Sequence, residues 1–579
     1  MEEEKVEKVK GKVVKSKQEQ KRINKRNSMF WGLGVTVVFG LLMWYLTLPA
    51  LNVQNEALWG SIILLSLVYS LVYALVYSVL DGKTKLHKSA NGIVFDANIK
   101  RDVPLKKLWR TKEGIGITVA AVALLVLIVG KFFSATFFHA KQYDNIIKVT
   151  NSEFATDMPE TTNISNIALI DTESAKIIGN RTLGSLSDVV SQYEIAKNYS
   201  QINYRHQPKK VASLEYAGLI KWIKNKNSGI PGYVMVDPVS NDAQYMKFSK
   251  PVKYTDSGYF GDDLKRKLRF EYPTKMFGSY YFEVDDEGNP YYIVSCLKAN
   301  VGLFGAKDVA EVVIFNPCDG SSVLYDVADV PSWVDIVFDG DLATKKYNWY
   351  GDLSGGFWNS VLGNKDCKKT TDDYGYITID DDVWYFTGVT SVTGDESNIG
   401  FIITNARTGE YRYYSVNGAE EYSAMHAAEG EVQEKGYVAS FPSLVNISGQ
   451  PSYIMVLKDS GGLVKLYALV NVEKYSIVAT GTTQNEAISN YRKLLQKANM
   501  DEPGDSETET ADVVVSLVRI IEIDKQAVVY LTAEDGTVYK SYLNTDESLI
   551  LIREGDALSI CYDETDIPGI REIFTWTRK

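Results

Sequence analysis

Residues on which most catalytic, metal and disulfide sites depend are scarce in this sequence. Of its 579 residues, four are cysteine and four are histidine. No CxxC pair occurs, and neither the HExxH pattern of zinc enzymes nor the GxSxG elbow of serine hydrolases is present. Cys296 and Cys318 fall on neighbouring predicted strands. The sequence is compatible with one disulfide bridge between them and equally with two free thiols. The sequence offers no catalytic residue, no metal ligand and no cofactor motif, so we expect a protein that is not an enzyme.

Apolar runs long enough to cross a membrane are absent after residue 133. Three such runs precede that point, at Phe30–Pro49, Leu58–Leu80 and Gly114–Phe133. Their apolar cores hold no charged residue, which argues against an ion or proton path and favours a simple anchor. Tyr69, Tyr73 and Tyr77 recur every fourth residue on one face of the second run. Packing within the helix bundle or toward lipid is expected for them, with a partner inside the membrane as the alternative.

Positive charge is in deficit beyond the apolar runs. Residues 1–134 carry 20 Lys and Arg against 10 Asp and Glu, whereas residues 135–579 carry 42 against 63. So acidic a region repels phosphate backbones, which argues against general nucleic-acid binding. Residues 1–28 and 81–112 are basic, while the loop 50–57 carries one charge, so the positive-inside rule predicts a cytoplasmic amino terminus. We therefore expect a multi-pass protein of the cell membrane, with the lipid bilayer as one partner and a large extracytoplasmic carboxyl-terminal domain.

A hairpin pattern occurs three times in the acidic region, at Tyr233–Tyr245, Val312–Tyr325 and Phe401–Tyr413. In each segment an apolar strand ends in Asp or Asn, and Asn or Gly follows four residues later. The first side chain caps a turn and the second residue accepts a positive φ, so each segment predicts a hairpin. The pattern, clearest from Asn405 to Glu410, resembles the PepSY family of small extracytoplasmic domains. That resemblance implies regulatory or inhibitory binding modules of the cell envelope and no catalysis.

Helical patterns are fewer in this region. Segments Ser185–Ile195 and Ser213–Lys226 are predicted to be helices. In the second, Ser213 would be the N-cap and one face would carry Leu214, Ala217, Ile220 and Ile223. A capping box from Thr483 to Glu486 predicts a further helix over residues 484–498.

The last residues form a separate unit behind an acidic linker. Asn499–Asp512 is rich in acidic residues and has no apolar period. Five or six short strands are predicted in residues 513–579, one of them over residues 549–552, LILI. Short strands at even spacing favour a small closed barrel of OB or SH3-like type. Its acidic surface again argues against nucleic acid as the ligand.

The predicted fold class is an α-helical membrane anchor of three spans, followed by an α+β region of tandem antiparallel-sheet units and a C-terminal small β-barrel (OB/SH3-like). The predicted segments are the basic tail 1–28, the transmembrane unit 29–134, the lead-in 135–230, the PepSY-like region 231–350, repeat units 351–435 and 436–498, the linker 499–512 and the barrel 513–579.

An acidic run could supply oxygen ligands to Ca²⁺. Asp380, Asp381 and Asp382 are consecutive, and Asp395 and Glu396 follow nearby. No EF-hand spacing is present, so solvated turns are expected in place of a metal site.

Aromatic residues gather near the middle of the acidic region. Trp349, Tyr350 and Trp358 lie in the glycine-containing run Asn348–Ser360, and Trp384 lies on a predicted strand. Such rings can stack on sugars or bind a protein, and the alternative is that they fill sheet cores. We expect a non-enzymatic extracytoplasmic binding or scaffold protein that contacts other envelope proteins. A protein that binds cell-wall glycan through these residues is the alternative, and a hydrolase whose site is not visible in the sequence is a more distant one.

Overall fold

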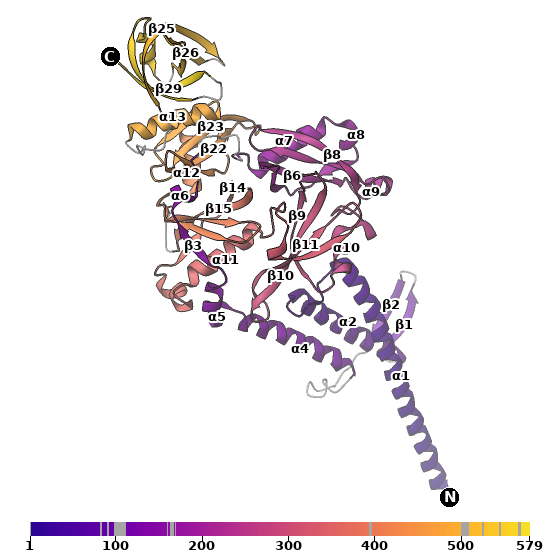
Figure 1. Ribbon diagram of the computed structural model, residues 1–579. Helices are drawn as coiled ribbons and strands as arrows, with labels where there is room; N and C mark the ends of the chain where they lie inside the picture. The colour runs from indigo at the N-terminus through magenta and orange to yellow at the C-terminus, as the bar shows by residue number, and fades with distance from the viewer. Residues whose placement is uncertain are drawn as a thin grey trace.

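The computed structural model describes residues 2–81, 84–89, 92–97, 112–158, 160–161, 167, 169–392, 397–498, 509–523, 526–543, 546–564 and 569–579. Three long apolar helices come first: α1 (Glu2–Thr47), α2 (Glu56–Leu80) and α4 (Lys112–Phe133). Each contains a stretch long and apolar enough to cross a membrane, which confirms the three predicted runs. A hairpin of β1 (Thr84–Ser89) and β2 (Gly92–Ala97) lies between α2 and α4 in the chain. Figure 1 shows the helices projecting from one end of a large β-rich body.

Glycines let the three helices pack closely around the tyrosines of α2. A Cβ added at Gly32 of α1 would lie 3.1 Å from the Tyr69 ring, and one added at Gly116 of α4 would lie 2.4 Å from a backbone oxygen of α2. Tyr69 and Tyr73 are buried, and the rings of Tyr73 and Tyr77 stack 6.1 Å apart. Small residues at such an interface allow helix backbones to approach one another in a membrane. The tyrosine row therefore packs largely within the bundle.

Four antiparallel meanders make up most of the described body. The first sheet holds β4 (Tyr193–Ile195), β5 (Ser200–Tyr204), β6 (Gln207–Tyr216), β7 (Ile230–Asp237) and β8 (Asp242–Val252). The second holds β9 (Met276–Val284), β10 (Pro290–Val301), β11 (Gly305–Phe315) and β12 (Ser322–Asp326). The third holds β13 (Lys368–Thr370), β14 (Gly375–Ile379), β15 (Asp382–Ser391), β17 (Gly400–Asn405) and β18 (Tyr411–Tyr414). The fourth holds β20 (Val438–Ala439), β21 (Ser443–Ile447), β22 (Gln450–Lys458), β23 (Val464–Asn471) and β24 (Val478–Gly481). In the first, third and fourth sheets the first edge strand comes in two pieces, which pair with the same long second strand.

The last turn of each of the first three meanders carries the hairpin pattern of the sequence. The side chains of Asp237, Asn316 and Asn405 accept hydrogen bonds from backbone amides two or three residues later. The residue four positions after each has a positive φ. Asn471 opens the corresponding turn of the fourth sheet and accepts from the Lys474 amide at 2.7 Å. The three predicted hairpins are confirmed, and the sheets repeat one local design.

A helix follows each meander and packs against a sheet. These helices are α10 (Leu264–Glu271), α11 (Gly340–Leu353), α12 (Glu421–Glu431) and α13 (Gln484–Lys497). Leu264 and Leu268 of α10 lie in a core formed by the first and second sheets. Ala424 and Ala428 of α12 lie between the third and fourth sheets. The helix α7 (Thr172–Gly184) covers the first sheet, so the body alternates helices and sheets.

The chain between α4 and α7 ties the ends of this series together. Its strand β3 (Val149–Ser152) adds to the third sheet in parallel with β18. Glu160 then bridges to Asn446 of the fourth sheet. At the start of α7, Asp171 pairs with Lys458 of the fourth sheet at 2.7 Å. The four sheets therefore follow one another around a closed circuit, in which the first sheet meets the fourth (Figure 1).

Two predicted helices were wrong. Ser213 belongs to β6 and is no N-cap, and only α9 (Leu219–Asn225) is helical in that segment. Leu214 is buried on the strand, whereas Ile220 and Ile223 of α9 are exposed. Strand β6 pairs with β4 and β5 on one side and with β7 on the other, and that ladder outweighs the local helical period. Residues 185–195 form only the short α8 (Ser187–Val190) before β4.

The C-terminal unit consists of β25 (Glu509–Ile523), β26 (Gln526–Ala533), β27 (Val538–Tyr542), β28 (Ala557–Glu564) and β29 (Ile570–Arg578). The strands pair in the order β25, β26, β27, β29, β28, and β28 pairs with β25. The strand predicted at residues 549–552 was wrong, because Glu547–Leu551 forms a 3₁₀ helix, η6. Residues 499–508 of the predicted linker lie outside the described residues. All four cysteines are free, so Cys296 and Cys318 are not bridged.

The second sheet is joined directly to the ends of the apolar helices. Ser134, just after α4, accepts hydrogen bonds on Oγ from the amides of Leu303 and Phe304 at 3.0 and 3.1 Å. Gln54, just before α2, exchanges two hydrogen bonds with the backbone of Ala299, at 3.1 and 3.2 Å. The β10–β11 turn and the end of β10 thus contact the residues next to the ends of α2 and α4. These contacts fix the second sheet relative to the apolar helices. Other short elements include α5 (Thr136–Asp144), α6 (Phe154–Asp157), η4 (Asn359–Gly363), β16 (Ser397–Asn398) and β19 (Gly418–Ala419).

Candidate functional site

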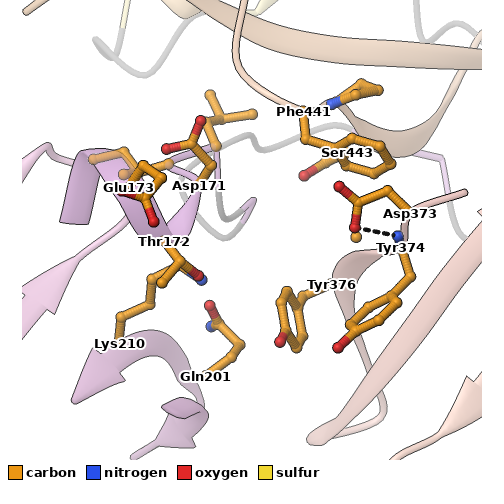
Figure 2. Close-up of a pocket in the computed structure, with 14 residues that line it drawn as sticks. Asp171, Thr172, Glu173, Gln201, Lys210, Asp373, Tyr374, Tyr376, Phe441 and Ser443 are labelled. Carbon is orange, nitrogen blue, oxygen red and sulfur yellow. Dashed lines mark hydrogen bonds between the residues drawn. The ribbon is translucent and has the colours of Figure 1, made fainter. Parts of the chain in front are cut away.

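A pocket of about 350 Å³ lies where the first, third and fourth sheets meet. Its walls come from the start of α7, from β5 and β6, from β14 and the residues before it, and from the segment that leads into β21. Its volume falls within the range of small-ligand sites. Figure 2 shows Gln201 and Lys210 at its base, with the rings of Tyr374 and Tyr376 on the opposite side. No single element makes this pocket, because it exists only where the circuit of sheets closes.

Gln201 and Lys210 are brought together by strand register. They are direct partners in the antiparallel pair of β5 and β6, so their side chains lie side by side on one face. Gln201 is 2% exposed and Lys210 is 3% exposed. Neither amide atom of Gln201 has a hydrogen-bond partner among the residues that the structure describes. Buried amides are ordinarily hydrogen-bonded, and an amide left unpaired at the base of a pocket is therefore available to a ligand.

Lys210 places a buried ammonium group beside that amide. Its Nζ lies 4.8 Å from the centre of the Tyr376 ring, a cation–π distance. Burial lowers the pKa of Lys210 to about 8, against an opposing pull from the negative charge of Asp171. Within the described part of the chain Lys210 forms no ion pair with a carboxylate. A mostly protonated and weakly compensated ammonium group is thus held at the pocket base at neutral pH.

Asp171 forms a rigid wall of the pocket. It is the N-cap of α7 and accepts a hydrogen bond from the Ser174 amide at 2.7 Å. Its other oxygen accepts from Lys458 Nζ, also at 2.7 Å, and Lys458 donates further to Ser174 Oγ at 3.0 Å. Burial raises the pKa of Asp171, but the hydrogen bonds from Lys458 and Ser174 outweigh that effect and hold it below its ordinary value. Asp171 is therefore a satisfied carboxylate, whose charge is already neutralised by Lys458.

The rim of the pocket is acidic. Glu173 and Asp373 are exposed and lie on opposite sides of the opening (Figure 2). Asp373 accepts a hydrogen bond from the Tyr374 amide at 2.8 Å, and Glu173 pairs with Lys176 at 2.7 Å. The pocket thus offers a cation and a free amide at its base and carboxylates at its mouth. Such a site can hold an anionic or carbonyl group below and a cationic group above.

The four aromatic residues predicted as a binding surface each contact other parts of the protein. Trp384 is 3% exposed, and the Arg412 guanidinium lies 4.7 Å from its ring. Trp349 and Tyr350 are half-buried on α11, where the Trp349 ring meets Tyr143 at 5.0 Å. Tyr350 packs on Tyr347 at 5.8 Å. Of the four, only Trp358 is largely exposed, at 63%.

The acidic run near residue 380 is engaged in protein contacts. Asp382 accepts two hydrogen bonds from the Arg407 guanidinium, each at 2.8 Å. Asp381 lies 2.8 Å from His206 Nδ1. Within the described residues no group of three or more His, Cys, Asp or Glu is placed to hold a metal ion. Asp395 and Glu396 lie outside the described residues.

Reasoning from sequence missed Gln201 and Lys210. The one available signal was Lys210 itself, a charged residue directly before the apolar residues of β6. The residues from Ser213 onward were predicted to be a helix, so this strand and its lysine were not recognised. The ammonium group of a lysine on a strand is usually solvated. Here residues from other sheets, such as Tyr376, bury it. No protein-family model matches this chain, and no curated protein matches it either. Its function is therefore inferred from the geometry of this pocket.

Proposed function

We propose that this chain is a non-enzymatic, membrane-anchored binding protein whose central pocket takes a small zwitterionic ligand, such as an amino acid or a short peptide. The Gln201–Lys210 pair carries the proposal. Among the described residues the buried ammonium group has no ion pair and the buried amide has no partner, and both favour a carboxylate or carbonyl oxygen from a ligand. Each of these groups is costly to bury without a partner, and a bound carboxylate would accept hydrogen bonds from both the Lys210 ammonium group and Gln201 Nε2.

The acidic rim supports a zwitterion over a simple anion. Glu173 and Asp373 would face the ammonium end of an amino acid whose carboxylate reaches Lys210. A simple anion would have to pass these carboxylates without any compensating contact. The tyrosine rings of Tyr374 and Tyr376 supply an apolar wall with polar tips, which suits a small organic ligand.

The charge distribution supports an extracytoplasmic pocket. Basic residues flank the apolar helices at 1–28 and 81–112, and the positive-inside rule favours a cytoplasmic side for these segments and an extracytoplasmic side for the body. The repeated sheet-and-helix units agree with the likeness to PepSY modules and with a protein that contacts other envelope proteins or the cell wall. The cyclic strand pairing of the C-terminal unit supports the small barrel of OB or SH3-like type as a second contact surface.

Thermal unfolding of the full-length protein in detergent tests the ligand class. Free amino acids and dipeptides are the zwitterionic probes, succinate is the anionic probe and putrescine the cationic probe. A ligand at about 100 times its Kd stabilises the folded state by about 2.7 kcal/mol, which raises the Tm of a chain of this length by about 2–3 °C. We expect a zwitterion to give the largest shift and Lys210→Met to remove it, whereas Gln201→Met, with an affinity about tenfold weaker, should reduce it to about half.

Lys226→Met is the matched control. Lys226 also stacks on an aromatic ring, that of Trp222 at 5.0 Å, but it is exposed and outside the pocket. Its replacement should leave the Tm shift intact. A shift that is undiminished in both pocket variants, or the absence of a shift with every probe, would contradict the proposal.

A further inference from the structure

Exposed apolar side chains surround the place where α4 enters the body. Phe137 of α5 is 47% exposed, and Trp358, Val361 and Leu362 in and beside η4 are 63%, 54% and 76% exposed. Phe137 meets the Trp358 ring at 5.8 Å, so these residues form one surface. We call it the α5–η4 patch. Exposed side chains of this size, gathered in one place, mark a surface that contacts something apolar.

A second group of this kind lies on α9. Leu219, Ile220 and Ile223 of that helix are 44%, 68% and 54% exposed, and Phe260 beside it is 62% exposed. The centres of the Trp222 and Phe260 rings lie 5.9 Å apart. We call these residues the α9 patch. Their exposure is unusual for a helix whose sequence carries an apolar residue at every third position.

Both patches are continuous with the ends of the apolar helices. On one side, Phe137 packs on Phe138 at 4.8 Å, and Phe138 packs on Phe132 of α4 at 4.9 Å. On the other side, Arg266 donates to the backbone oxygen of Phe260 at 2.7 Å and to that of Tyr45 of α1 at 3.3 Å. Each patch therefore adjoins the last turn of a helix that is long and apolar enough to span a membrane.

The two patches lie on opposite sides of the helix ends. Figure 1 shows α11, which precedes η4 in the chain, to the left of the helix ends, and α9 above and to the right of them. A membrane that holds the helices ends at the level of these last turns, where aromatic side chains are favoured. Lys221 and Lys224 alternate with the apolar residues of α9, which is the composition of a segment that lies in a lipid interface.

We propose that the α5–η4 patch and the α9 patch both insert into the surface of the leaflet from which the helices emerge. The body then rests on the bilayer at two points outside the helix bundle and is not carried on a mobile stalk. Trp358 contacts lipid in this arrangement, and not sugar or a partner protein. The hydrogen bonds of Ser134 and Gln54 to the second sheet keep the body in this orientation.

Site-specific labelling of the full-length protein in vesicles tests this arrangement. Cys318→Ser and Cys561→Ser remove the two cysteines that are only partly buried. A single cysteine is then introduced by Leu362→Cys or by Ile220→Cys and labelled with an environment-sensitive fluorophore. The vesicles contain phosphatidylcholine and phosphatidylglycerol, with or without a lipid that bears a doxyl quencher on its acyl chain. We expect a blue-shifted emission and at least about a twofold quenching at both positions.

Tyr475→Cys is the matched control. Tyr475 is 55% exposed on the turn between β23 and β24, and Figure 1 shows β23 on the side of the body away from the helices. The label there should be neither blue-shifted nor quenched. Labels at 362 and 220 that behave like the one at 475 would overturn the proposal. A blue shift without lipid quenching, which increases with protein density in the vesicle, would overturn it in favour of a contact between two copies of the chain.

Discussion

Replacing Gln201 with methionine separates the stability of the protein from its binding activity. Gln201 is almost fully buried, and neither of its amide atoms has a partner in the described structure. Methionine has a similar length and volume and leaves no strong polar group unpaired. Because an unsatisfied buried polar group costs about 1–3 kcal/mol, we expect Gln201→Met to raise the free energy of unfolding by that amount.

The same substitution should weaken ligand binding. If the amide contacts a carboxylate or carbonyl oxygen, its loss removes a hydrogen bond made only in the complex, and affinity should fall by about tenfold, or about 1.4 kcal/mol. Denaturant unfolding of the full-length protein measures the first effect, and calorimetric titration with the best zwitterionic probe measures the second. A gain in stability with a loss of affinity is typical of a residue retained for binding.

Asn471→Leu provides the control for burial of an amide. Asn471 is fully buried, but its Oδ1 accepts from the Lys474 amide at 2.7 Å and its Nδ2 donates to the Tyr491 hydroxyl at 3.1 Å. Removing this satisfied amide should lower the free energy of unfolding by about 1–3 kcal/mol and leave affinity unchanged. If Gln201→Met were equally destabilising, its amide would be satisfied within the protein and the reasoning would be refuted.

Lys210, Asp335 and Gly116 provide the remaining tests. Because burial lowers the pKa of Lys210 to about 8, the unfolded chain binds more protons above that pH, and stability should rise by roughly 2–3 kcal/mol between about pH 7 and pH 10. Lys210→Met should lack this rise in denaturant titrations, and an unchanged rise would contradict the assignment. Burial and the neighbouring Glu283 raise the pKa of Asp335. The folded state therefore binds more protons, stability should fall as pH increases from about 4 toward neutrality, and Asp335→Asn should flatten that fall. Gly116→Val should lower the Tm in detergent because the valine side chain would collide with α2. Gly60→Val is the control, because an added Cβ there meets nothing within 4 Å, and it should leave the Tm unchanged. Equal Tm values for the two variants would refute the proposed helix packing.

Local sequence was sufficient for the apolar helices and for the hairpin turns. A spanning helix requires only a continuous apolar run, and α1, α2 and α4 coincide with the three runs found in the sequence. A capped turn requires only an Asx residue and a residue that tolerates positive φ four positions later, as at Asn405 and Gly409. Both signals are carried by residues close together in the chain, so no knowledge of distant partners is needed.

Strand β6 shows where local reasoning fails. Its apolar residues fit a helical period as well as a strand, and Ser213 fits an N-cap. The choice is made by β4, β5 and β7, which pair with β6 from both sides. These pairing strands are separate segments of the chain, so the local hydrophobic period of β6 carries no information about them. Local propensity alone therefore predicted the wrong element.

The sequence by itself determined that the chain has a three-helix apolar end, a basic-to-acidic change of charge and repeated Asx-turn hairpins. Only the tertiary structure decided where the pocket lies and which residues line it. Gln201 and Lys210 are paired by the register of β5 and β6, and Tyr376 reaches them from the third sheet. Whether a glutamine or lysine is solvated or buried depends on what covers it, and here the cover comes from sheets far away in the chain. The same reason explains why Trp358 is exposed and Trp384 is buried, although both stood out equally in the sequence.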